Sequence, residues 1–177
     1  MTWVYVVLAI VVLAVGLAWL SWSANRLDRM HHRIDVARAT LDTQFLRRSG
    51  AALELATSGA LDPAQSLLLV DSAHHARAES GGDFESAESD LSETLRAVFG
   101  DPGQVRSLRA DPAVAPLVEE LADDCHKVEL ARRFHNDVVA SARALRTRRR
   151  VRWLRLAGRA MDLGTVDLDD GPPRTLG

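Results

Sequence analysis

The stretch from Trp3 to Trp22 constrains this chain more than any other, because it contains no charged residue. A helix rises about 1.5 Å per residue, so about 20 residues cover the roughly 30 Å hydrocarbon core of a membrane. The apolar run exceeds the roughly 7–15 residues of a signal-peptide core, and no basic residue precedes it. The stretch therefore predicts a transmembrane anchor over residues 1–24.

The charges that flank this stretch predict its orientation. No Lys or Arg precedes it, whereas four arginines follow it closely: Arg26, Arg29, Arg33 and Arg38. Basic residues favour the cytoplasmic side of a membrane. We therefore expect a single-pass protein of the cell membrane, with the N-terminus outside and the C-terminal domain in the cytoplasm.

The composition after the anchor favours helices. Ala and Leu predominate and β-branched runs are absent, which is typical of helical rather than strand-rich domains. Cys125 is the only cysteine, so an intrachain disulfide is excluded. Apolar residues recur every three to four positions in four segments. We expect helices from about Asn25 to Ser58, from Asp62-Pro63 to about Ser80, from Asp83 through Val98, and from Asp111-Pro112 to about residue 147.

Four amphipathic helices with short connections predict an all-α fold, an N-terminal transmembrane helix followed by an antiparallel up-down four-helix bundle over residues 25–147. Gln104 to Ala110 is expected to be a partly helical piece between the third and fourth helices. A three-helix bundle, with a middle helix broken at Gly81-Gly82, is the alternative. Residues 148–163 then form a basic amphipathic segment, and residues 164–177 are expected to be an acidic, Pro/Gly-containing disordered tail.

Two runs within these helices resemble a known family. The first helix carries IDVARATLDTQFLRR from Ile34 to Arg48, and the fourth carries ARRFHNDVV from Ala131 to Val139. Both are similar to motifs of the LemA family, bacterial proteins with one N-terminal span and a cytoplasmic helical bundle. Arg38 stands where the family has Trp, His135 where it has Tyr, and Leu53-Glu54 where it has Pro-Asn. The resemblance implies a divergent member and no particular reaction.

Polar residues in these two runs are candidates for contacts between helices. Asp and Arg on facing helices form charge-assisted pairs that fix helix register. Solvated helix faces and a ligand site are the alternatives. The candidate interhelical network comprises Asp42, Gln44, Arg47, Arg48, Arg132, Asn136 and Asp137.

The sequence lacks motifs for catalysis or metal binding. The histidines, His31-His32, His74-His75, His126 and His135, do not have the spacing of a zinc site. Neighbouring side chains on a helix point about 100° apart and chelate poorly. Neither a glycine-rich phosphate loop nor a nucleophile elbow occurs. We therefore expect a protein that is not an enzyme and has no metal or cofactor.

The densest positive charge follows the fourth helix. No acidic residue occurs between Asp137 and Asp162, and arginines there alternate with apolar residues. Basic residues and a Trp on one amphipathic segment suit an anionic membrane surface. A solvated helix end is one alternative, and packing of Trp153 and Leu154 on the bundle is a second. Nucleic-acid binding is a third, which the net charge of −2 disfavours. The candidate membrane-surface residues are Arg148, Arg149, Arg150, Arg152, Trp153, Arg155 and Arg159.

Together these patterns predict a LemA-like, membrane-anchored helical bundle that is a non-catalytic scaffold or adaptor for a protein partner at the inner face of the membrane. The alternative is a membrane-tethered ligand sensor or an accessory subunit of a membrane enzyme, with the polar network as its pocket. Near-heptad apolar stripes also pair between chains in coiled coils, so a homo-oligomer is a further expectation to test.

Overall fold

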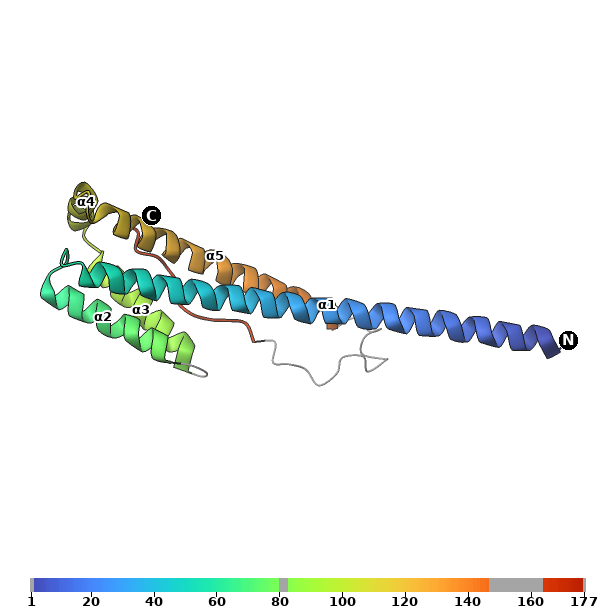
Figure 1. Cartoon of the computed structure of the whole chain (residues 1–177). Coiled ribbons are helices and arrows are strands. Elements are labelled where there is room, and N and C mark those ends of the chain that lie inside the picture. Colours follow the sequence, from blue (N-terminus) through green and yellow to red (C-terminus); the bar gives the residue numbers. More distant parts are fainter. Residues whose placement is uncertain (1, 80–82, 147–163, 177) are drawn as a thin grey trace. The chain divides into compact units, whose positions relative to one another are not determined.

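The computed structural model describes residues 2–79, 83–146 and 164–176, and these residues form an all-α fold. Of residues 17, 20–31, 145 and 146 only the helical backbone is described. The prediction of an all-α fold is therefore confirmed. The five helices are α1 (Thr2–Thr57), α2 (Pro63–Ala78), α3 (Phe84–Val98), α4 (Pro102–Ala110) and α5 (Ala115–Arg146) (Figure 1).

The chain divides into two compact units. One comprises residues 1–36 and 138–164. The other, called here the bundle unit, comprises Ala37–Asp137 and Thr165–Gly177. The bundle unit is discontinuous in the sequence, because its C-terminal segment returns to it after the residues of the other unit.

The first unit contains the N-terminal part of α1, whose apolar side chains are exposed. Trp3 is 81% exposed, and Tyr5, Leu8 and Ile10 are exposed as well. Among the residues that the structure describes, no helix combines the length and the apolar character needed to cross a membrane. The anchor predicted over residues 1–24 falls partly outside this description, since the side chains of residues 17 and 20–24 are not part of it.

Helix α1 ends as its sequence predicts. The last helical residue is Thr57, and Gly59 takes a φ of 80°, a left-handed conformation that glycine adopts without steric cost. Helix α2 then begins at Pro63 after an aspartate cap. The Asp62 carboxylate accepts hydrogen bonds from the backbone N–H groups of Ala64 at 2.9 Å and Gln65 at 3.1 Å. The acid-proline signal therefore starts this helix.

Asp111-Pro112, predicted to begin the fourth helix, starts a turn instead. The backbone N–H of Asp111 donates to the carbonyl of Leu108 at the end of α4, and its carbonyl accepts from Val114 and Ala115. Helix α5 begins only at Ala115, so the predicted start was too early. The piece expected from Gln104 to Ala110 is helical and begins earlier, at Pro102 of α4.

The main core of the bundle unit is built by the apolar stripes of its helices. Leu55 of α1, Leu69 of α2, Leu91 of α3 and Leu121 of α5 are fully buried in one cluster. Cys125 lies in the same cluster, as its place on the apolar stripe of α5 predicts. Burial of this kind stabilises a domain by roughly 1.5–3 kcal/mol for each large aliphatic side chain.

The C-terminal segment corrects the prediction of a disordered tail. Thr165–Leu176, called here the tail, has no helix or strand, yet it packs within the bundle unit (Figure 1, red). Val166 and Leu168 are buried in a second apolar cluster, against Phe45 of α1 and Val128 of α5. Burial alternates along the tail, because Asp167 between these two residues is exposed. This period of two is that of an extended chain with one face inward.

Candidate functional site

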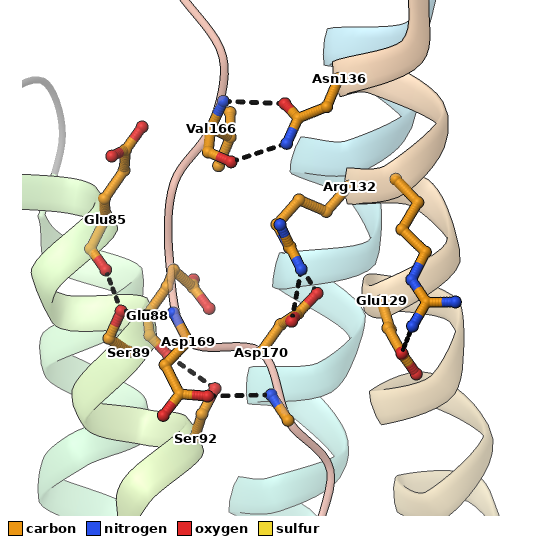
Figure 2. Close-up of polar contacts among 12 residues, drawn as sticks. Glu85, Glu88, Ser89, Ser92, Glu129, Arg132, Asn136, Val166, Asp169 and Asp170 are labelled. Carbon is orange, nitrogen blue, oxygen red and sulfur yellow. Dashed lines mark hydrogen bonds and ion pairs between the residues drawn. The ribbon is translucent and has the colours of Figure 1, made fainter.

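The side chain of Asn136 on α5 holds the backbone of the tail. Its Nδ2 donates to the carbonyl of Val166, and its Oδ1 accepts from the N–H of Val166, both at 3.0 Å. One amide side chain thereby satisfies both polar backbone groups of one residue, as a neighbouring β-strand does. Figure 2 shows this pair of hydrogen bonds above the other polar contacts of the tail.

One turn of α5 away, Arg132 holds the side chain of Asp170. Its Nε donates to Oδ2 at 2.6 Å and its Nη2 to Oδ1 at 2.8 Å, which is a bidentate ion pair. The Asp170 side chain is only 8% exposed. Hydrogen bonding to Asp170 raises the pKa of Arg132 above its usual value, so the guanidinium stays charged. A buried carboxylate of this kind depends on its partner, because an unpaired charge is costly to bury.

Helix α3 contacts the tail from its other side (Figure 2). Arg96 donates to both carboxylate oxygens of Asp169, at 2.7 and 3.1 Å, and to the carbonyl of Gly171 at 2.9 Å. The backbone N–H of Asp169 donates to Ser89 Oγ at 3.2 Å. The pKa of Asp169 lies below its usual value, chiefly because the backbone N–H of Gly171 donates a hydrogen bond to its carboxylate. The hydrogen bond from Arg96 lowers this pKa further.

The end of the tail is held through its backbone carbonyls. Arg109 of α4 donates to the carbonyl of Thr175 at 3.2 Å and to that of Leu176 at 2.9 Å. The Thr175 hydroxyl donates to the carbonyl of Phe99, just after α3. The side chain of Leu176 is buried in the main core.

These contacts define the direction of the tail and the surface beneath it. From the beginning of the tail to its end, its partners on α5 change from Asn136 to Arg132, towards the N-terminus of that helix. Its partners on α3 change from Ser89 to Arg96, towards the C-terminus of that helix. The tail thus runs antiparallel to α5 and parallel to α3. We call the residues that hold it the tail-binding surface: Leu41, Phe45, Ser89, Arg96, Phe99, Arg109, Val128, Arg132 and Asn136.

A second polar site lies inside the bundle unit, around Arg48 of α1. Arg48 is 1% exposed, and its Nη2 pairs with Glu88 Oε2 on α3 at 2.5 Å. The guanidinium also donates to Ser92 Oγ at 2.8 Å and to the Glu88 carbonyl at 3.1 Å. Burial raises the pKa of the Glu88 carboxyl, and the charge and hydrogen bond of Arg48 limit that rise. This ion pair joins α1 to α3.

The predicted polar network does not form as one cluster. Arg48 pairs with α3, whereas Arg132 and Asn136 hold the tail. Asp42 pairs with Arg38 of its own helix at 3.0 Å, and Arg47 is exposed.

The remaining two members, Asp137 and Gln44, give no support to a single cluster. Asp137 is exposed, and Gln44 has a buried Oε1 that finds no hydrogen-bond partner among the described residues. The contacts of Arg48, Arg132 and Asn136 described above run to α3 and to the tail, whereas the sequence pattern predicts them between the first and fourth helices. Three of its residues do hold elements together, but each with a partner that the prediction did not include.

Sequence periodicity contained a signal for the partners that were missed. Arg48 lies three residues after Phe45, on the apolar stripe of α1, and Glu88 lies three residues before Leu91, on that of α3. Opposite charges on two buried stripes indicate a buried ion pair. For the tail, Val166, Leu168 and Asp170 share a spacing of two, which is the mark of one inward face.

Two other predictions concern the basic segment and metal binding. The basic segment 148–163, with its candidate membrane-surface residues, lies outside the described residues. Within the described ranges, no group of three or more His, Cys, Asp or Glu side chains is placed to hold a metal ion.

Comparisons with known proteins give no match to any protein-family model, to any curated protein or to any solved structure. The resemblance to the LemA family therefore stays a prediction from the two sequence runs.

Proposed function

We propose that this protein is a LemA-like, single-pass membrane protein whose cytoplasmic helical bundle is a non-catalytic scaffold or adaptor. The observation that carries the proposal is the row of exposed apolar side chains on α1 from Trp3 to Val15. Each square ångström of apolar surface in water costs about 25 cal/mol. Soluble monomers rarely expose a contiguous apolar patch beyond several hundred square ångströms. A lipid environment removes this cost, which supports an anchor formed by the uncharged stretch Trp3–Trp22.

The finer architecture follows from the same reasoning. We propose that the bundle part of α1, together with α2, α3 and α5, forms the antiparallel up-down four-helix bundle, and that α4 is a short connector. Buried leucines from all four of these helices meet in one cluster, which supports the arrangement. The predicted orientation places this bundle in the cytoplasm, because arginines follow the anchor and none precedes it.

The contacts of the tail favour a scaffold over a ligand sensor. A sensor would need an open pocket lined by Asp42, Arg132 and Asn136. Arg132 and Asn136 are instead occupied by the tail, and Asp42 pairs within its own helix. By contrast, Leu67 and Leu68 of α2 are exposed apolar side chains that a protein partner could cover.

Membrane fractionation of the full-length chain tests the anchor. The protein is expected in the membrane pellet after alkaline carbonate washing. Replacing Leu8 and Val11 by Arg should release it, because each arginine near the centre of a span costs about 2.5–3.5 kcal/mol. The matched control replaces exposed Leu67 and Leu68 of α2 by Arg and should stay in the pellet. Carbonate extraction of the wild-type chain would refute the anchor.

In-cell cross-linking followed by mass spectrometry tests the scaffold. A reproducible protein partner on the bundle unit is the expected result. Recovery of the protein only as a monomer, with a bound small molecule, would contradict the scaffold and favour a sensor.

A further inference from the structure

We propose that the tail-binding surface is a docking site for a partner protein, and that the tail occupies it as an internal copy of the partner's segment. The inferred ligand is an extended, acidic peptide in the pattern aliphatic-x-aliphatic-x-Asp/Glu, after Val166, Leu168 and Asp170. This inference deepens the proposed scaffold function and rests on it for the existence of a partner.

The surface binds backbone groups that every peptide has. Asn136 pairs with both the N–H and the carbonyl of one tail residue. Arg96 donates to the carbonyl of Gly171, and Arg109 donates to those of Thr175 and Leu176. Such contacts recognise an extended main chain and do not depend on its side chains. A separate segment can therefore make them as well as the tail does.

The side-chain contacts supply the specificity. Val166 and Leu168 fill the apolar cluster beside Phe45 and Val128. Two residues beyond Leu168, Asp170 meets Arg132 in a bidentate pair. Because residues at this spacing share one face of an extended chain, two aliphatic side chains and one carboxylate enter together. A basic residue at the third position would meet Arg132 with like charge and be rejected.

Charge argues for an acidic occupant. Arg96, Arg109 and Arg132 come from three helices and all donate to the tail. The tail carries Asp169 and Asp170 against two of them. An uncovered surface would thus present the guanidinium groups of Arg96 and Arg132, whereas Arg109 keeps its ion pair with Glu119 at 2.7 Å. Two unpaired guanidinium groups attract acidic segments and steer their approach.

The helices do not depend on the tail for their main core. In the larger apolar cluster the tail contributes Leu176 alone, and all other members come from helices and their connections. Uncovering the surface would expose Asn136, Arg96 and Arg132, which water can solvate. It would also expose Phe45 and Val128, which the aliphatic side chains of another segment can cover again. The tail is therefore an exchangeable part of the bundle unit, held at high local concentration by its covalent link.

The test uses the full-length chain in detergent micelles and a fluorescent peptide of residues 164–176 as the probe. In wild-type protein the covalent tail competes with the probe. Asp170→Asn weakens the tail at Arg132, so the probe should bind about tenfold more tightly than to wild type. Asp167→Asn removes an exposed charge of the same tail that acts on Arg132 only through its field, so this variant should change probe binding far less than Asp170→Asn does.

Second substitutions locate the binding. Arg132→Leu, added to Asp170→Asn, should abolish binding of the probe. Arg133→Leu in the same background is the matched control, because Arg133 is the exposed neighbour that pairs with Glu129. A scrambled peptide of identical charge excludes general attraction to basic residues. Hydrogen exchange at the Val166 amide, which Asn136 holds in the docked state, reports whether the tail has left the surface.

Each outcome decides the proposal. Tighter binding to Asp170→Asn that needs Arg132 supports it. Release of the tail without probe binding, or no release at all, overturns it. Concentration-dependent association of Asp170→Asn chains without the probe would also overturn it, because a second copy's tail would then be the occupant. None of these failures bears on the anchor, which membrane fractionation tests separately.

Discussion

Separating the buried ion pair Arg48–Glu88 is expected to destabilise the bundle unit more than any surface substitution. In Arg48→Met the methionine fills much of the same space but donates no hydrogen bond. The Glu88 carboxylate, 2% exposed, then loses its partner at 2.5 Å. The Ser92 hydroxyl keeps its own hydrogen bond to the Glu88 carbonyl, so the unpaired carboxylate dominates the loss.

The magnitude follows from the burial of the pair. Removing one partner of a buried ion pair costs about 3–5 kcal/mol, out of the roughly 5–15 kcal/mol by which a domain is stable. Replacing both partners, as Arg48→Met with Glu88→Leu, removes the charges together and should be nearly neutral or stabilising. Arg47→Met, at the exposed neighbouring position, should change the free energy of unfolding by less than about 0.5 kcal/mol.

The loss should also depend on pH. Burial raises the pKa of Glu88 in the folded chain, and removing Arg48 takes away the group that limits the rise. A carboxyl with a raised folded pKa favours the folded state below its unfolded pKa, near 4.3, and this contribution is lost as the pH rises through the folded value. The free energy of unfolding of Arg48→Met should therefore be closest to that of wild type at acidic pH, and the difference between them should grow towards pH 8.

Urea unfolding followed by circular dichroism measures these differences. Tryptophan fluorescence does not report on this unit, because all four tryptophans lie outside Ala37–Asp137 and Thr165–Gly177. A loss below about 1 kcal/mol in Arg48→Met would refute the reasoning, since it would fall under the cost of an unpaired buried charge. A double variant as unstable as the single one would refute it equally.

Three further predictions concern the tail and the core. Asn136→Ala removes two hydrogen bonds to Val166 and should weaken tail docking by about 1–3 kcal/mol. Faster amide hydrogen exchange in the tail would show this weakening. Asp137→Ala, at the exposed neighbouring position, should leave the exchange rates of the tail unchanged. The hydrogen bonds of Asp169 hold its pKa below its usual value. The stabilisation of the folded state by these bonds is therefore present above about pH 4 and is lost as the pH falls through the folded pKa. Asp169→Asn should lack this dependence of stability on pH. Burial raises the pKa of Cys125 to about 11, so iodoacetamide at pH 8 should modify it only after unfolding in urea, and rapid labelling of the folded protein would contradict its burial.

The helices and their inward faces could be predicted because local rules determine them. Asp62-Pro63 begins a helix through contacts within its own turn, and the spacing of Leu121 and Cys125 assigns them to the core. The Asp111-Pro112 signal failed in part, because Asp111 also ends the preceding helix and its carbonyl closes a turn.

The partners of the polar residues could not be predicted from composition alone. The acidic tail has the composition of a disordered segment, and only the alternation of Val166, Leu168 and Asp170 separates it from one. That Asp170 meets Arg132 depends on the chain returning to α5, which no local pattern states. Pairing of Arg48 with Glu88 likewise depends on which helix lies opposite α1.

The return of the tail to α5 has a consequence for how this protein tolerates insertions. The hydrogen bonds between Asn136 and Val166 close a loop across 30 positions of the sequence. The entropic cost of closing a loop grows only with the logarithm of its length, so doubling that length weakens closure by about 0.6 kcal/mol. Extra residues between α5 and the tail should therefore change tail docking little, and a reporter domain inserted there would signal when the tail leaves its surface.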